Sequence, residues 1–251
     1  TEHCTSNNRK ESKFFSFFNK QFYKIFDYTV CITKEIQEVY IKYTSLDKIR
    51  FPVIKNGINF DQFEYAKKID LSLFFNKSNN KSNNKSKYII QVSAFRKQKD
   101  HETLIKSLNF LDPCFKLLLA GIGEEMNKIK RLVKDLKLEN RVVFLGLRKD
   151  VPSILISCDY IVLSTHFEGM SLSCMEAMYS GTPLLASNVK GVKNLVEGFG
   201  VLLEPKNSKD IADKILELDN NTNKYNEVSK RSKKRAKNFD SKIMAQEYLD
   251  L

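Results

Sequence analysis

The sequence predicts an α/β protein: a Rossmann-like parallel sheet with helices on both faces, together with a partial second α/β domain. Two observations support this prediction. From residue 87 onward, short runs rich in Val, Ile and Leu alternate with helix-length segments, as in parallel sheets that are buried on both faces. The chain of 251 residues is also 42% apolar, which is ample for a packed core.

Residues 1–58 are expected to be the remnant of an N-terminal domain. Periodicity and β-rich composition predict helices over 13–26 and 34–43 and strands over 28–33 and 50–54. Thr33 is suited to cap the second of these helices, because its hydroxyl can accept from a free backbone N–H group. Residues 59–86 have weak periodicity and end in a Lys/Ser/Asn repeat, so we expect a linker there.

Residues 87–251 carry the regular alternation and are expected to form one domain. Strands are predicted at 88–92, 115–120, 141–145, 160–163, 183–186 and 201–203. Helices are predicted at 100–110, 124–138, 151–157, 171–179 and 192–197, followed by an almost entirely helical stretch over 208–251. In such sheets ligands bind at the carboxyl ends of the strands.

Charge leaves two interpretations open. The chain has 42 Lys and Arg against 30 Asp and Glu, a formal net charge of +12. The basic tracts at 77–87 and 230–237 are either solvated faces or contacts with an anionic partner, such as a membrane surface or nucleic acid. Because the charges are dispersed along the chain, no nucleic-acid partner is expected.

Cysteine usage predicts a reducing compartment. The five cysteines are odd in number and show no CxxC pairing, and the three histidines share no spacing, so neither a disulfide framework nor a metal site is expected. There is no apolar run of ~20 residues and no signal-peptide pattern, which predicts a cytoplasmic location. The chain begins at Thr1 rather than Met, and we expect a fragment whose beginning is missing.

Two loops that follow predicted strands carry cations and glycines. Arg96 and Lys99 precede a predicted helix, where they could bind a diphosphate or remain solvated. Gly121 and Gly123 form a tight turn after the next strand. This turn is not a complete dinucleotide-binding motif, because Met126 stands where the third glycine would be, and a structural turn is favoured over a ligand-binding role.

Two further loops complete the predicted ligand edge. After residue 145, Arg148 could face the ligand, and Asp150 could cap the following helix. After residue 163, Glu168 and Glu176 flank a predicted helix start. A helix start suits an anion and carboxylates accept from hydroxyls, so this segment is suited to a sugar attached to a diphosphate. His166 either contacts substrate or packs the loop.

Together these loops resemble the C-terminal nucleotide-sugar-binding domain of the GT-B glycosyltransferases, specifically the large retaining group called family 4 or glycosyl transferases group 1. The signature is two glutamates separated by seven residues, here Glu168 and Glu176. The other matching segments are 98–101, 119–123, 144–146, 150–151 and 180–183, with 27–33 and 56–60 in the front portion. The resemblance implies a GT-B type fold, with residues 87–251 as the donor-binding domain.

The resemblance also implies roles for individual residues. Lys99 would bind the donor's diphosphate, Glu168 would contact the transferred sugar, and Glu176 would hold the ribose hydroxyls, with Lys99 and Glu168 as the catalytic pair. Arg96 would take the place of the family's phosphate-binding Arg, because Ala94 stands at that Arg's usual position. The remaining donor-binding residues implied are Gly123, Arg148, His166, Gly169, Met170, Ser171 and Leu172.

The function implied is a hexosyltransferase (EC 2.4) that moves a sugar from a UDP- or GDP-sugar to a glycan or lipid-linked acceptor with retention. The context implied is surface polysaccharide biosynthesis. No metal or cofactor is expected, and the cytoplasmic protein would contact the anionic inner face of the membrane. Most of the acceptor domain is absent, so the chain alone is expected to be incomplete as a catalyst. The alternatives are a GT-B nucleotide-sugar-binding protein or epimerase without transferase activity and, remotely, a basic nucleic-acid-binding protein.

Overall fold

The computed structural model describes residues 20–75 and 85–251. The chain divides into two compact units, one of Thr1–Ile58 with Phe239–Leu251 and the other of Asn59–Asn238. The last 13 residues, which the sequence analysis assigned to the second domain, thus belong to the first unit. The first half of the predicted helix over 13–26 and most of the Lys/Ser/Asn tract lie outside the described residues, and residues 20–25 are helical as predicted.

The larger unit contains a six-stranded sheet in the order β3-β2-β1-β4-β5-β6, and every neighbouring pair is parallel. The strands are β1 (Lys87–Val92), β2 (Phe115–Ala120), β3 (Val142–Gly146), β4 (Tyr160–Leu163), β5 (Leu184–Ser187) and β6 (Val201–Leu203). All six predicted strands are therefore present, with ends that differ by one residue at most. The predicted parallel α/β class is confirmed.

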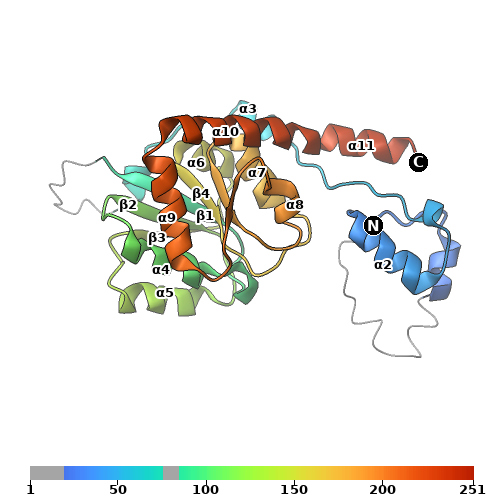
Figure 1. Cartoon of the computed structure of the whole chain (residues 1–251), viewed down its shortest axis with the longest axis horizontal. Helices are drawn as coiled ribbons and strands as arrows, with labels where there is room; N and C mark the ends of the chain where they lie inside the picture. Colours follow the sequence, from blue (N-terminus) through green and yellow to red (C-terminus); the bar gives the residue numbers. More distant parts are fainter. Residues whose placement is uncertain (1–19, 76–84) are drawn as a thin grey trace. The chain divides into compact units, whose positions relative to one another are not determined.

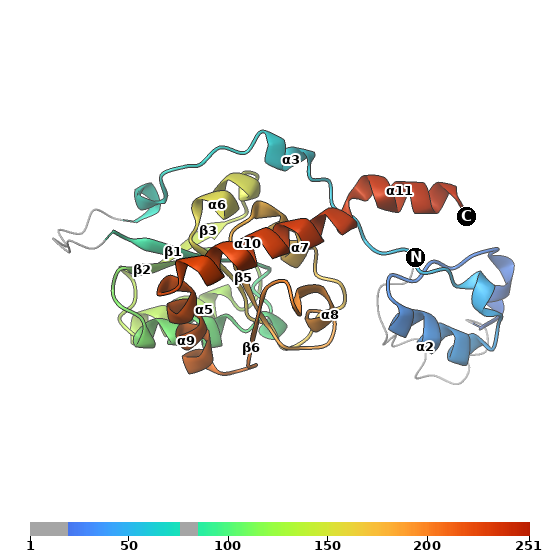
Figure 2. The same cartoon turned by 45° about the horizontal axis from the view of Figure 1, so that its top comes forward.

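Helices connect the strands and cover both faces of the sheet. They are α3 (Asp61–Glu64), α4 (His101–Ser107), α5 (Met126–Asp135), α6 (Val151–Ser157), α7 (Leu172–Ser180), α8 (Lys193–Val196), α9 (Ser208–Asp219) and α10 (Thr222–Ala236). Helices α4, α5 and α9 lie on one face, with α6, α7 and α10 on the other (Figures 1 and 2). The apolar stripes of the first group pack on one face of the central strands to form a buried core.

Two predicted helices differ from the observed ones in where they end. The predicted helix over 100–110 is α4 followed by a 3₁₀ turn, Leu108–Phe110. The long helical stretch from 208 is interrupted at Asn220 and Asn221, and the Asn221 side chain caps α10 by accepting from the N–H of Lys224 at 2.9 Å. Asparagine side chains compete for backbone groups in this way and favour caps over helix interiors.

The described part of the predicted linker is attached to the sheet unit. The segment contains α3 and a 3₁₀ turn, Leu71–Phe74. The N–H of Ile69 donates to Ser157 Oγ at 2.9 Å. The ring of Phe60 stacks on that of Tyr179 of α7 with centroids 3.8 Å apart. This segment therefore packs on α6 and α7 and is not a free tether.

The smaller unit contains α2 (Lys34–Thr44), a 3₁₀ turn Lys48–Arg50, and α11 (Ser241–Leu249). Thr33 caps α2 as predicted, because its hydroxyl accepts from the N–H of Ile36 at 3.2 Å. The two predicted strands, in contrast, form only a single parallel bridge between Cys31 and Val53. Within the described residues no further strand pairs with this bridge, and a two-stranded pair is marginal by itself, which accounts for the difference.

No helix in the described ranges is both long enough and apolar enough to cross a lipid bilayer.

Candidate functional site

The strand order reverses between β1 and β4. Strands β2 and β3 extend from one side of β1, while β5 and β6 extend from the other side of β4. In an open parallel sheet this reversal separates the loops that leave the two central strands and makes a crevice at their carboxyl ends. The predicted residues Arg96 and Lys99 follow β1, and those from His166 to Leu172 follow β4.

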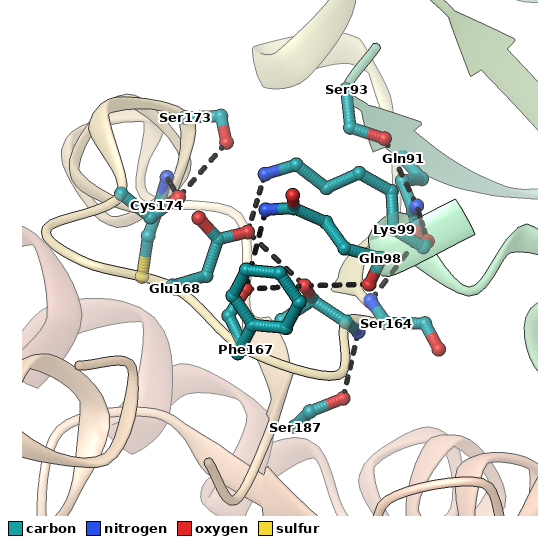
Figure 3. A network of polar contacts seen from close by, with 12 residues as sticks. Gln91, Ser93, Gln98, Lys99, Ser164, Phe167, Glu168, Ser173, Cys174 and Ser187 are labelled. Carbon is teal, nitrogen blue, oxygen red and sulfur yellow. Dashed lines mark hydrogen bonds and ion pairs between the residues drawn. The ribbon is translucent and has the colours of Figure 1, made fainter. Parts of the chain in front are cut away.

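The structure brings Lys99 and Glu168 together at this point. The Lys99 ammonium forms an ion pair with Glu168 Oε1, and the two side chains are only 14% and 9% exposed (Figure 3). Thr165 Oγ1 lies 3.2 Å from the same carboxylate oxygen. A largely buried cation and carboxylate thus stand side by side at the carboxyl edge of the sheet.

Further hydrogen bonds join the loops after β1 and β4. The N–H of His166 donates to the carbonyl of Gln98 at 2.7 Å. Gln91, inside β1, is fully buried and its side-chain amide contacts both loops. The sequence analysis did not identify Gln91. The available signal was a single amide within an apolar strand, since a buried polar group requires hydrogen-bond partners.

The start of α7 provides backbone donors. Ser171 caps the helix, and its hydroxyl lies 3.4 Å from the N–H of Cys174. Within the described ranges, the N–H groups of Gly169, Met170 and Leu172 donate to no protein acceptor. Free amides at a helix start favour an anion or an oxygen acceptor. The predicted backbone donors are thus adjacent to Glu168 in the chain.

Glu176 lies further along α7. Burial raises the pKa of its carboxyl above the ordinary value, and a hydrogen bond with Gln62 of α3 partly offsets this effect. No recorded contact in the described chain joins Glu176 to Lys99 or Glu168. Its predicted role on the ribose remains a prediction.

Arg96 and His166 are close in sequence to Lys99 and Glu168, but their side chains differ in solvent exposure. The Arg96 side chain is exposed. His166 Nδ1 is buried without a hydrogen bond and stands 3.6 Å from Asp100 Oδ2, beyond hydrogen-bond distance. Asp100 itself caps α4. The His166 backbone links the two loops, and the two alternatives for its side chain, substrate contact or loop packing, remain predictions.

The fold requires a glycine at position 123 because of a close backbone contact. A Cβ atom there would stand 2.7 Å from the carbonyl carbon of Phe95 and 2.8 Å from its nitrogen. The Phe95 N–H donates to the carbonyl of Ile122 at 3.0 Å, and the N–H of Glu125 donates to that of Phe95 at 2.9 Å. Only a residue without a side chain lets the loops after β1 and β2 approach this closely.

Arg148 is placed on the outer side of the sheet. It follows β3, which β2 and β1 separate from β4. Its guanidinium donates to both carboxylate oxygens of Asp150, at 2.8 and 2.7 Å, and lies over the ring of Phe74. The predicted capping by Asp150 is wrong: Asp150 occupies the N-cap position of α6, but Arg148 takes its carboxylate and no side-chain cap bond forms.

His101 is a buried titratable group beside the site. Its ring stacks on Phe95 with centroids 4.2 Å apart, and Nε2 lies 3.2 Å from Ser93 Oγ. Burial, with a smaller effect of the nearby Lys99 ammonium, lowers the pKa of His101 to about 4. The imidazole is therefore neutral at physiological pH.

Among the described residues, no group of three His, Cys, Asp or Glu side chains is arranged to hold a metal ion. The absence of a metal from the reaction stays a prediction.

This sheet, its reversal point and its helix start define a Rossmann-like domain of the GT-B class. The crystal structure of Anabaena HepE in complex with UDP has the same fold, with a TM-score of 0.81 at 22% identity over 99% of this chain and 70% of that chain. A Staphylococcus aureus TarM structure gives a TM-score of 0.76 at 21% identity, over 99% of this chain and 48% of that one. At these identities the similarity shows the fold alone.

The chain belongs to the family of glycosyl transferases group 1, whose model matches residues 74–235. It is 31% identical over 179 residues, 68% of this chain and 46% of the relative, to UDP-Gal:alpha-D-GlcNAc-diphosphoundecaprenol alpha-1,3-galactosyltransferase of Escherichia coli. It is 30% identical over 220 residues, 85% of this chain and 55% of the relative, to an uncharacterized glycosyltransferase of Methanocaldococcus jannaschii. The chain thus spans about half the length of these curated relatives.

Proposed function

We propose that the protein is a hexosyltransferase that binds a UDP- or GDP-sugar at the reversal point of the sheet and transfers the sugar with retention. The observation that carries this proposal is the Lys99–Glu168 pair beside the free amides at the start of α7. A cation and helix-start amides suit a diphosphate, and a carboxylate suits sugar hydroxyls. Membership in glycosyl transferases group 1 supports the same assignment.

The proposed chemistry follows the charges of the reaction. Cleaving the bond between sugar and diphosphate develops positive charge at the anomeric carbon and negative charge on the leaving diphosphate. Lys99 and the amides of Gly169, Met170 and Leu172 stabilise the leaving group, and such preorganised donors can be the largest catalytic contribution. Glu168 accepts from hydroxyls of the transferred sugar. Glu176 accepts from the ribose hydroxyls when it is ionised. Arg96, His166 and Ser171 complete the proposed donor contacts.

The acceptor is proposed to be a glycan or a lipid-linked glycan of a surface polysaccharide. The Escherichia coli relative is named for a diphosphoundecaprenol-linked acceptor, which supports this class. We further infer contact with an anionic membrane. Lys230, Lys233 and Lys234 are exposed on α10, whose opposite side is buried. Each basic residue near an anionic surface contributes about 1 kcal/mol.

A thermal-shift screen tests donor binding. UDP, GDP, ADP and their sugars are added separately, and the preferred nucleotide should raise Tm because it binds only the folded state. Lys99→Ala and Glu176→Ala should reduce this shift. Lys106→Ala is the matched control, because Lys106 forms an exposed pair with Glu102 on α4. If no nucleotide raises the Tm of the wild type, the proposed donor site is wrong.

Product analysis separates transfer from the alternatives. Incubation with the preferred nucleotide sugar and a lipid-linked acceptor gives transferred sugar, epimerised donor, or bound but unchanged donor. We expect this chain by itself to bind donor without turnover, because it spans only about half the length of its curated relatives; full turnover would contradict that expectation. A retained anomeric configuration in the product of the complete enzyme, measured by NMR, tests retention.

Vesicle flotation tests the membrane contact. The protein should float with acidic vesicles at low salt, and Lys230→Glu/Lys233→Glu/Lys234→Glu should abolish flotation. Neutral vesicles are the control. Binding of an unrelated RNA with a steep salt dependence would instead favour the nucleic-acid alternative.

A further inference from the structure

Gln91 interrupts an apolar strand at the centre of the sheet. Its neighbours in β1 include Ile89, Ile90 and Val92, and the Gln91 side chain is 0% exposed. A buried amide costs free energy unless its donors and acceptor are paired. The contacts of Gln91 therefore indicate why an amide occupies this position.

The amide joins the two loops that carry Lys99 and Glu168. Gln91 Nε2 donates to the Lys99 carbonyl at 2.8 Å and to Ser93 Oγ at 3.0 Å, both after β1. Gln91 Oε1 accepts from the N–H of Ser164, directly after β4, at 3.0 Å. Figure 3 shows these contacts beside the ion pair. The backbone partners also fix the orientation of the amide, because one is a donor and the other an acceptor.

The backbone ladder between β1 and β4 stops short of this end of the sheet, and beyond it the N–H of His166 donates to the carbonyl of Gln98 at 2.7 Å. Strands β1 and β2 pair over six residues up to Val92 and Ala120. Strands β1 and β4 pair only at Ile89 with Tyr160 and at Ile90 with Ile161. Beyond that pairing, the Gln91 side chain continues the link across the opening where the site lies.

We propose that Gln91 is a positioning residue that holds the loops after β1 and β4 in one register and thereby sets the spacing of Lys99 and Glu168 for the donor. The effect on donor binding, the functional part, rests on the proposed donor site. The holding of the two loops, the mechanical part, does not. Removing the amide leaves the buried Ser164 N–H and the part-buried Lys99 carbonyl without the partner that Gln91 supplies, so the two loops open more readily to reach water.

Two variants and one control test this role. Gln91→Met keeps the length of the side chain and removes both polar groups. Gln91→Glu keeps the shape, and its carboxyl can donate to the Lys99 carbonyl only when protonated. Ile90→Val is the control, since Ile90 is fully buried in the same strand and the change costs a methylene group without altering a loop hydrogen bond.

Amide hydrogen exchange measures the mechanical part without any ligand. The Ser164 and His166 amides should exchange at least roughly tenfold faster in Gln91→Met than in Ile90→Val, after correction for global stability. Unchanged exchange overturns the proposal. If Gln91→Met does not fold, Gln91→Glu is compared with Ile90→Val in the same way. Its Ser164 and His166 amides should then show greater protection, relative to the intrinsic exchange rate at each pH, at pH 5 than at pH 8.

Calorimetric titration with the nucleotide that the wild type prefers measures the functional part. Gln91→Met should bind about tenfold more weakly, the effect of losing one hydrogen bond of ordinary net strength. The affinity of Gln91→Glu relative to wild type at the same pH should recover as pH falls, whereas that of Gln91→Met should not. Faster exchange with wild-type affinity overturns the functional part. Failure of the wild type to bind any nucleotide refutes the donor site instead, and the exchange result still decides the role of Gln91 in the loops.

Discussion

The Lys99 ammonium and the Glu168 carboxylate pair across 69 positions of sequence, with both side chains largely withdrawn from solvent. Two charges in this setting depend on each other, because either one alone would be buried without compensation. The same groups are those proposed to receive the diphosphate and the sugar. The pair therefore links the stability of the empty protein to its proposed function.

Lys99→Met should destabilise the ligand-free protein by about 3–5 kcal/mol, because it leaves the Glu168 carboxylate buried and unpaired. The double variant Lys99→Met/Glu168→Leu should recover part of this loss. Urea denaturation of the single and double variants measures the coupling. Lys106→Met is the control, since the Lys106–Glu102 pair is exposed and should contribute about 0–1 kcal/mol. Additive losses in the double variant would contradict this prediction.

Glu176→Gln should stabilise the ligand-free protein at neutral pH while weakening nucleotide binding. Burial raises the carboxyl pKa in the folded state, so wild-type stability falls as pH rises from the ordinary value of 4.5 through the raised folded pKa. Glutamine has no such dependence. Urea denaturation at several pH values and calorimetric titration of the preferred nucleotide measure both effects. A variant less stable than wild type at pH 7 would refute the first part.

His101→Phe should remove a pH dependence of stability. The folded imidazole titrates at about 4, whereas an unfolded one titrates near 6.5. Wild-type stability should therefore fall as pH drops from about 6.5 towards 4, by about 2–4 kcal/mol in total. Urea midpoints of wild type and variant between pH 4.5 and 7.5 check this. Parallel curves for the two proteins would show that His101 does not cause the fall.

Gly123→Ala should weaken nucleotide binding as well as stability. The new methyl group would collide with the Phe95 backbone and displace the loop that carries Lys99, at a cost of about 1–3 kcal/mol. Gly198→Ala is the matched control. Gly198 has a φ of 79° but open space around it, so the change should cost stability of about 1–2 kcal/mol without affecting binding. Equal affinities for the two variants would contradict the prediction.

The strands could be predicted because a parallel sheet covered on both faces requires short, mostly apolar runs. Runs such as Phe115–Ala120 fit a buried strand of this kind. The ligand edge followed from the rule that loops gather at the carboxyl ends of strands. The order of the strands could not be predicted from the sequence. The direct contact of Lys99 with Glu168 depends on that order, so it could not be predicted either. Arg148 was expected to face the ligand because its loop lies on the same edge; it follows the outer strand β3, and its contact with the donor remains a prediction.

Competition between neighbouring side chains for the same hydrogen-bonding group could also not be predicted from the sequence. Asp150 has the residue type of a helix cap, and only the fold reveals that Arg148 occupies its carboxylate. Similarly, residues 28–33 have a strand composition, but pairing depends on neighbours that the sequence pattern does not specify. The roles assigned to individual donor-site residues by family resemblance remain predictions that the proposed variants can decide.

The reversal of strand order has a consequence for biosynthesis. Lys99 follows the first strand of the sheet and Glu168 the fourth, so the pair cannot form until the chain has been made through β4 and that strand has docked beside β1. Nascent chains emerge from the N-terminus, and the half of the sheet made of β1, β2 and β3 is complete before any of the β4 loop exists. Acquisition of nucleotide affinity during synthesis would therefore mark the moment when the two halves of the sheet join.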